Sequence, residues 1–167
     1  PGYSAAAGSP GRGQPLIPPG STAELGKPPM KYDHKDAIRL ESFVRNLAEG
    51  RRIDVQINGP MQSHYEAGRK FFYKPSGQLD MACAHCHVRY VGTRLRAQLL
   101  SQGQSNGFPV YRLANNRVNS LHQRIRQCQN LLRSAYQKAG SDDYIDLEVF
   151  MNARSNGLRI ETPAIRY

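Results

Sequence analysis

Residues 81–87 read Met-Ala-Cys-Ala-His-Cys-His, and this stretch decides the fold. It contains C-x-x-C-H, the attachment signal of a c-type haem. Cys83 and Cys86, one helical turn apart, supply thiols that add to the two vinyl groups of the porphyrin. His87 then faces the iron as the proximal ligand. The pattern predicts one covalently attached haem c, with His85 filling the loop between the cysteines.

A structural zinc site is the other chemistry that a CxxC pair beside a histidine suggests. Such a site needs four protein ligands, usually as two spaced pairs. The chain has 3 cysteines, so only Cys128 remains, and its other histidines lack zinc-finger spacing. Haem is therefore the favoured interpretation.

Length and cysteine usage indicate the compartment. At 167 residues the chain is about one domain long, and it has no apolar run long enough to predict a membrane span. Haem is attached to CxxCH outside the bacterial cytoplasm, so we expect a periplasmic location. No signal peptide opens the sequence, which suggests a processed or trimmed chain. The unpaired Cys128 is then either a reactive thiol or a small buried apolar residue.

Positive charge is concentrated in the middle of the chain. The net charge is +10, and residues 81–141 hold 8 arginines and 1 lysine but no aspartate or glutamate. Such a block attracts anions or an acidic partner. No nucleic-acid motif accompanies it, so nucleic acid is not an expected partner. A solvated basic face without a specific role remains the alternative.

Hydrophobic spacing and turn residues predict a mainly α, class I cytochrome c-like domain around the haem. We expect an extended Pro/Gly-rich arm over residues 1–32, a helical lead-in over 33–58 and the cytochrome c domain over 59–167. Helices are expected at about 33–48, 61–73, 94–101, 116–135 and 141–157, with a loop over 102–109. In the first helix, Ala37, Leu40, Val44 and Leu47 are expected to share one face.

The helix expected at 116–135 carries the leftover cysteine. Cys128 falls at helical spacing on the stripe formed by Val118, Leu121, Ile125 and Leu132, which predicts that the thiol points inward. Arg124 lies one turn before Cys128 and can neighbour it. A guanidinium beside a thiol favours the thiolate, the form that binds metals and attacks electrophiles.

The second axial ligand of the haem distinguishes the possible functions. A methionine ligand indicates a simple electron carrier, and Met151 lies at a suitable distance from His87 along the chain. Met151 follows Phe150 in an expected helix, where a core methionine is the rival interpretation. His122 is a further candidate, but it points away from the Cys128 stripe. Cys128 itself is the third candidate.

Several blocks of the sequence together resemble SoxA, the family of c-type cytochrome subunits in the SoxAX enzymes of bacterial thiosulfate oxidation. The blocks, which occur in the family's order, are Cys83–His87, Gly92–Arg96, Leu100–Gly103, Asn106–Arg112, Leu121–Cys128 and Asn156–Arg166.

The resemblance implies a haem c-dependent sulfur-transfer enzyme, an L-cysteine S-thiosulfotransferase. Cys128 matches the distal haem ligand and catalytic residue, as a thiolate or persulfide, and Arg124 matches an arginine implicated with it. Arg96 matches a second basic residue that binds the substrate. The implied partners are a small monohaem cytochrome like SoxX, a carrier like SoxYZ with a reactive cysteine, and thiosulfate. Thiosulfate is a small dianion, which suits the arginine-rich block.

One departure from the family concerns the N-terminal half. Full SoxA chains have two cytochrome-like domains, so the resemblance implies that residues 33–58 are the remnant of a shortened first domain. Two other functions stay open at this point. One is a non-catalytic electron-transfer cytochrome with His87/Met151 ligation, and the other is a haem-binding structural subunit with a decayed site.

Overall fold

The computed structural model describes residues 30–167, so the predicted extended arm lies outside the described residues except for its last three. In order, the elements are α2 (Lys35–Leu47), a 3-10 helix η1 (Gly59–Met61), α3 (Gln62–Tyr73), a π-helical turn η2 (His85–Arg89), β1 (Arg94–Leu95), β2 (Gln98–Leu99), β3 (Val110–Arg112), β4 (Arg117–Asn119), α4 (Leu121–Leu131), α5 (Asp142–Ala153) and β5 (Ala164–Arg166). Within this range, no helix has both the length and the apolar character that crossing a membrane requires.

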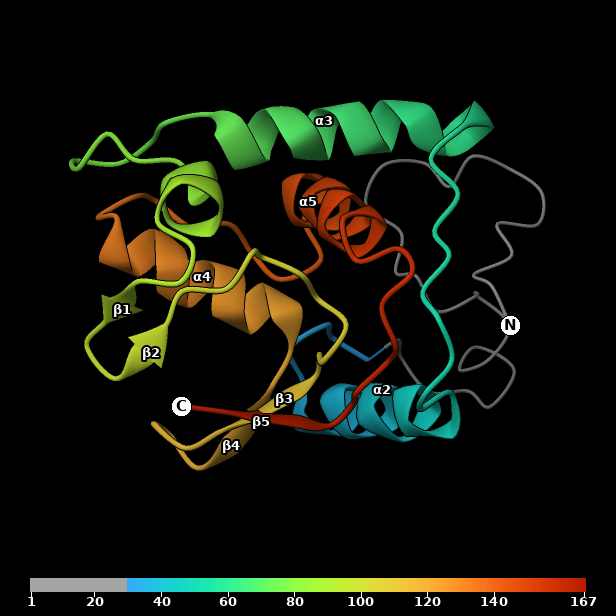
Figure 1. Ribbon diagram of the computed structural model, residues 1–167. Coiled ribbons are helices and arrows are strands. Elements are labelled where there is room, and N and C mark those ends of the chain that lie inside the picture. The colour runs from blue at the N-terminus through green and yellow to red at the C-terminus, as the bar shows by residue number, and fades with distance from the viewer. Residues whose placement is uncertain (1–29) are drawn as a thin grey trace.

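Helices α3 and α5 pack closely against each other and enclose the core (Figure 1). Gly68 allows this approach, because a Cβ atom there would lie 1.9 Å from the carbonyl oxygen of Asp146. The aromatic ring of Phe72 on α3 lies 5.2 Å from that of Phe150 on α5, a tilted aromatic contact. Helix α4 adds Leu121 and Ile125 to the same core.

A three-stranded sheet lies on the side of α4 away from α3 (Figure 1). Its strand order is β4-β3-β5, with β3 antiparallel to β4 and parallel to β5. The row of the register at the start of β3 places Val110 opposite Asn119 and Ala164, and all three are buried. The short β1–β2 hairpin lies beside the sheet and forms a separate two-stranded pair.

Most of the helical prediction is confirmed, with small shifts at the ends. Helix α3 matches the expected 61–73, and residues 102–109 form a loop without regular structure. Helix α5 begins after Ser141 as expected, with Asp142 and Asp143 in its first turn, although the Ser141 hydroxyl makes no capping hydrogen bond. Helix α2 begins after His34, whose Nδ1 accepts a hydrogen bond from the Asp36 amide.

The helix expected at 94–101 is wrong, because this segment forms the β1–β2 hairpin. Its backbone closes through hydrogen bonds from Gly92 N to Leu100 O and from Leu100 N to Thr93 O, both 2.9 Å. Gln98 on β2 also accepts a 2.8 Å hydrogen bond from Arg124 on α4. Such tertiary contacts override the helix propensity of the Arg-Leu-Arg-Ala-Gln-Leu-Leu sequence.

The helix expected at 116–135 is shorter, since Arg117–Asn119 pairs with β3 as strand β4. Ser120 begins α4 with a capping box in which its side chain and that of Gln123 satisfy two backbone amides. The shift changes the buried face of this helix. Leu121, His122, Ile125 and Gln129 are buried, whereas Cys128 is half-buried at the edge of that face.

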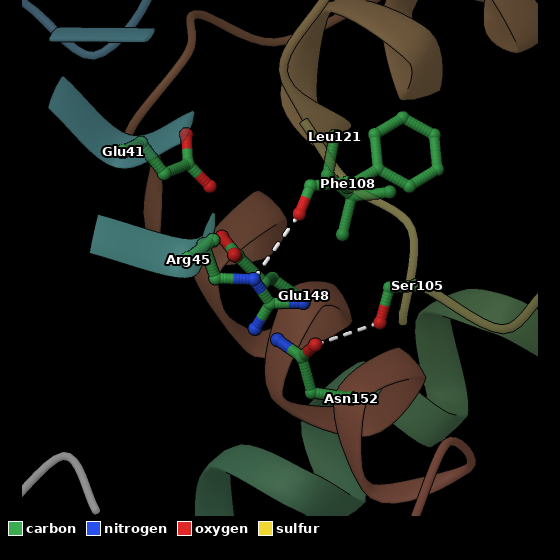
Figure 2. Close-up of a pocket in the computed structure, with 7 residues that line it drawn as sticks. All are labelled: Glu41, Arg45, Ser105, Phe108, Leu121, Glu148 and Asn152. Atoms are coloured by element: carbon green, nitrogen blue, oxygen red, sulfur yellow. Dashed lines mark hydrogen bonds between the residues drawn. The ribbon is translucent and has the colours of Figure 1, made fainter. Parts of the chain in front are cut away.

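The apolar face predicted for the first helix is also wrong, because it points outward. Leu40, Val44 and Leu47 are 47%, 55% and 69% exposed, and Ile38 is the buried residue of α2. Helix α2 instead docks through Glu41 and Arg45, which line a polar pocket together with Ser105, Phe108, Leu121, Glu148 and Asn152 (Figure 2). The Arg45 Nε donates a 3.1 Å hydrogen bond to the carbonyl oxygen of Phe108.

Candidate functional site

The CxxCH segment forms a tight turn between α3 and the β1–β2 hairpin. Residues 83–84 are helical and η2 continues the turn through His85–Arg89. The Nδ1 atom of His85 accepts a 2.9 Å hydrogen bond from the Ala82 amide. His85 therefore stabilises the turn from within, in agreement with its expected role as a loop filler.

His87 has the orientation of a metal-binding imidazole. Its Nδ1 lies 2.8 Å from the carbonyl oxygen of Ser101, so Nδ1 carries the proton and donates it. This hydrogen bond leaves the lone pair on Nε2, the arrangement found where a second partner fixes a ligating histidine. Burial lowers the pKa of His87, and the charges of Arg124 and Arg154 lower it further, so the neutral ligating form is favoured.

The backbone beside His87 is shaped to hold that ring. Gly103 has a φ of +73°, and a Cβ atom there would lie 3.1 Å from the His87 Cβ and 3.2 Å from its Cγ. Phe72 supports the ring from α3, with centroids 6.4 Å apart. Glycine suits position 103 for two reasons: the positive φ strains any residue with a Cβ, and a Cβ there would crowd the His87 side chain.

Cys128 on α4 lies near both cysteines of the CxxCH turn. All three thiols are free. Burial raises the pKa of Cys83 to about 12, and the neighbouring Cys128 adds to this rise. Cys128 likewise contributes, after burial, to the raised pKa of Cys86. The fold therefore brings a third sulfur to the turn from 42 positions further along the chain than Cys86.

Arg124 is half-buried one helical turn before Cys128, and no carboxylate of residues 30–167 pairs with it. Its Nη2 donates a 2.8 Å hydrogen bond to Gln98 Oε1, and its Nη1 donates a 3.3 Å hydrogen bond to Gln127 Oε1. These neutral partners fix the guanidinium without neutralising it. Its charge reaches His87, whose pKa it lowers. The positive charge remains available to an anion.

Arg96 occupies the exposed turn between β1 and β2, where its φ is +56°. The hairpin contacts the site at Gln98, which accepts a hydrogen bond from Arg124. The Arg96 side chain itself lies in solvent at the rim of that region.

The two alternative axial ligands are engaged elsewhere. Met151 is 9% exposed and packs in the hydrophobic core with Phe72 and Phe150. His122 has a partner at each ring nitrogen: Nδ1 accepts a 3.0 Å hydrogen bond from the Gly140 amide, and Nε2 lies 2.9 Å from Glu148 Oε2. Both side chains thus have structural roles in their present positions.

Sequence reasoning missed Arg112 as part of this region. It lies on β3, is 6% exposed, and its pKa is lowered by burial and by Arg124 and raised by Cys128. In the sequence, Arg112 is one member of the carboxylate-free basic block. Membership of that block does not distinguish one buried arginine from the seven other arginines and the lysine. Burial of Arg112 depends on the pairing of β3 between β4 and β5.

These residues fit a haem c. Two cysteines lie on one turn, an adjacent imidazole has a fixed and unprotonated Nε2, and a further sulfur approaches from α4. By contrast, no three His, Cys, Asp or Glu side chains in residues 30–167 are grouped to hold a metal ion. The donor set therefore suits covalent porphyrin attachment rather than a zinc site.

Comparison with known proteins gives consistent matches. The family model described as SoxA/TsdA, cytochrome c domain, matches residues 67–160. The L-cysteine S-thiosulfotransferase subunit SoxA of Rhodovulum sulfidophilum is 40% identical over 145 residues, which cover 87% of this chain and 50% of that protein. The subunit of the same name from Pseudaminobacter salicylatoxidans is 39% identical over 143 residues, covering 85% of this chain and 50% of that protein.

The fold is similar to that of a chain in the crystal structure of SoxXA from P. pantotrophus. The TM-score is 0.84 at 35% sequence identity, and the match covers 87% of this chain and 55% of that chain. The chain spans about half the length of the curated relatives it matches.

Proposed function

The chain belongs to the SoxA/TsdA cytochrome c domain family, and from this premise we propose that it is the catalytic, haem c-bearing part of a SoxA-type L-cysteine S-thiosulfotransferase. The shared name of the similar subunits supports this proposal. The observation that carries it is the place of Cys128, a half-buried sulfur near Cys83 and Cys86 with an uncompensated arginine one turn away.

The haem-holding residues follow from the geometry of the turn. When haem c is bound, Cys83 and Cys86 would form the two thioether bonds, His87 would hold the iron through Nε2, and Cys128 would hold it through sulfur. The haem would supply one-electron redox chemistry, and a thiolate ligand would lower its potential. Ser101 keeps the proton on His87 Nδ1, and Gly103 leaves the space in which the imidazole stands.

Cys128, as thiolate or persulfide, holds the sulfur substrate covalently. In the thiolate form, its sulfur joins the sulfane sulfur of thiosulfate, and the two electrons released pass one at a time to two equivalents of an oxidised monohaem cytochrome partner. The thiolate of a carrier cysteine then attacks the same sulfane sulfur, and the bond to Cys128 breaks as the new S–S bond forms. The net reaction conjugates thiosulfate to the carrier cysteine with loss of two electrons and one proton.

Arginines bind the anion during this exchange. Arg124 is fixed by Gln98 and Gln127, so its guanidinium is oriented before substrate arrives. A preorganised donor stabilises negative charge without reorganising. Arg96, on the exposed turn of the β1–β2 hairpin, meets the substrate from the solvent side.

The reaction needs two protein partners. A small monohaem cytochrome of the SoxX type accepts the electrons, which the similarity to a SoxXA structure supports. A carrier of the SoxYZ type presents the reactive cysteine. The location is periplasmic, because CxxCH haem attachment takes place outside the cytoplasm.

The test is thiosulfate-dependent reduction of an oxidised monohaem cytochrome in the presence of a thiol carrier, with the conjugate identified by mass spectrometry. Cys128→Ala should lower turnover by at least about a thousandfold, the scale on which loss of a covalent nucleophile acts. Asn130→Ala, an exposed position on the same helix, should leave turnover unchanged. Full turnover by Cys128→Ala would make the proposed function wrong.

A further inference from the structure

We propose that Arg112 is a second anion-binding residue of the Cys128 site, whose guanidinium holds the sulfonate end of thiosulfate together with that of Arg124. This inference rests on the proposed function, and it adds a residue that recognises the substrate.

Arg112 is 6% exposed, and its side chain has no hydrogen bond or ion pair with another of the described residues, 30–167. An arginine cannot shed its proton in a protein, so this mostly buried side chain carries a full positive charge. A buried, unpaired charge costs free energy that a structure normally offsets with a partner. The region from 81 to 141 contains no carboxylate that fills this role.

The sheet register places further positive charge around Arg112. Its Cα partners are Arg117 on β4 and Arg166 on β5, so three arginines form one row across the sheet. Like charges directly opposite each other destabilise a sheet. Arg117 and Arg166 are exposed to solvent, and Arg166 has Glu161 3.7 Å away. Arg112 is the member of this row that is turned inward without a carboxylate.

Cys128 and Arg124 both act electrostatically on Arg112. The pKa of Arg112 is lowered by burial and by the charge of Arg124, and it is raised by Cys128. The chain connects these residues rigidly: β4 pairs with β3, and Ser120 leads directly from β4 into the first turn of α4. The mostly buried guanidinium of Arg112 therefore lies within electrostatic reach of both Arg124 and Cys128.

This arrangement matches the chemistry of thiosulfate. Guanidinium groups bind oxyanions through forked pairs of N–H donors. The sulfonate end of thiosulfate offers three oxygens and negative charge, whereas the sulfane sulfur at the other end is the atom that must meet Cys128. Two arginines on the sulfonate end would orient the sulfane sulfur, and the anion would remove their mutual repulsion.

A propionate of the haem is the competing partner for a buried arginine in this position. Both partners are anions, but they make different predictions. An arginine that binds a propionate affects the haem potential and leaves thiosulfate affinity unchanged. An arginine that binds the sulfonate affects thiosulfate affinity, whether or not turnover is measured.

The experiment compares Arg112→Gln and Arg112→Lys with the matched control Arg117→Gln, all as haem-loaded proteins. Thiosulfate binding to the oxidised protein is measured by calorimetry without carrier, and KM and kcat are measured with carrier and cytochrome partner. Arg112→Gln should weaken binding and raise KM by about 10- to 100-fold, the effect of losing a charged hydrogen bond. Arg112→Lys should lose less, because it keeps the charge but not the fork.

Arg117→Gln should leave Kd and KM unchanged. An unchanged thiosulfate Kd in both Arg112 variants would overturn the inference, and a shifted haem midpoint potential alongside it would assign Arg112 to the propionate. Far-ultraviolet circular dichroism checks folding, and the lysine variant decides the matter if the glutamine variant does not fold. Thiosulfate binding is measured without turnover, so the two claims can fail separately. If thiosulfate binding depends on Arg112 but the protein has no transferase activity, the proposed function is refuted and the role of Arg112 in binding the anion stands.

Discussion

Glu41 carries a carboxyl group that the fold makes sensitive to pH. It lies on α2 in the polar pocket with Glu148 and Arg45 (Figure 2). Burial raises the pKa of Glu41 from 4.5 to about 7, and the nearby carboxylate of Glu148 adds to the rise. Arg45 and His122, which also act on it, lower the pKa by less. Glu41 therefore holds its proton more tightly in the folded protein than in the unfolded chain.

The sign of the effect follows from that difference. A group with a raised folded pKa contributes stability below its unfolded pKa of 4.5, and the contribution is lost as the pH rises through about 7. Each unit of pKa difference between the folded and unfolded states is worth 1.36 kcal/mol, so the protein loses about 3 kcal/mol of folding stability across this range. Most of this loss falls between about pH 5 and 8. This is a large fraction of the stability of a small domain.

Glu41→Gln removes the ionisation while keeping the shape of the side chain. Urea denaturation of the haem-loaded protein, followed by far-ultraviolet circular dichroism, measures the free energy of unfolding at pH 5 and pH 8. Between pH 5 and pH 8, the free energy of unfolding should fall by about 2–3 kcal/mol less in the variant than in the wild type. The variant should therefore be the more stable protein at pH 8.

Glu49→Gln, an exposed carboxyl just beyond α2, is the control and should leave the pH dependence unchanged. The reasoning is refuted if wild type and Glu41→Gln lose the same stability between pH 5 and 8. It is also refuted if the Glu49 variant behaves like the Glu41 variant.

Two glycine substitutions test the packing that positions the site. Gly68→Ala places a Cβ 1.9 Å from the Asp146 carbonyl oxygen, so α3 and α5 must separate, with a loss of about 3 kcal/mol or more in urea denaturation; wild-type stability would contradict the close contact. Gly103→Ala forces a Cβ to 3.1 Å from the His87 Cβ at a φ of +73°, and should shift the haem midpoint potential. Gly92→Ala, with a φ of +81° and no atom within 4 Å, should cost about 1 kcal/mol and leave that potential unchanged.

Local chemistry explains which parts of the site the sequence predicts. The spacing of Cys83, Cys86 and His87 defines haem attachment without reference to the rest of the chain. The turn that carries them is stabilised by short-range contacts such as the one between Ala82 and His85. Cys128 was identifiable because it is the one cysteine that the haem motif leaves over.

Long-range pairing explains what the sequence does not predict. Helix propensity favours a helix at 94–101, but the contact between Gln98 and Arg124 belongs to the tertiary structure. Burial of Arg112 depends on β5, which comes more than fifty residues later in the chain. The outward apolar face of α2 arises because Glu41 and Arg45, rather than Leu40 and Val44, face the pocket.

The central claim is that the Cys128 sulfur is an axial ligand of the haem iron. The most direct measurement is low-temperature EPR of the oxidised protein, beside the Cys128→Ala and Cys128→Met variants, with visible spectra of the same samples. We predict low-spin signals of the thiolate type in the wild type and their disappearance in both variants. Unchanged signals in the variants, with a methionine–iron charge-transfer band in the wild type, would contradict the claim and assign the ligand to Met151.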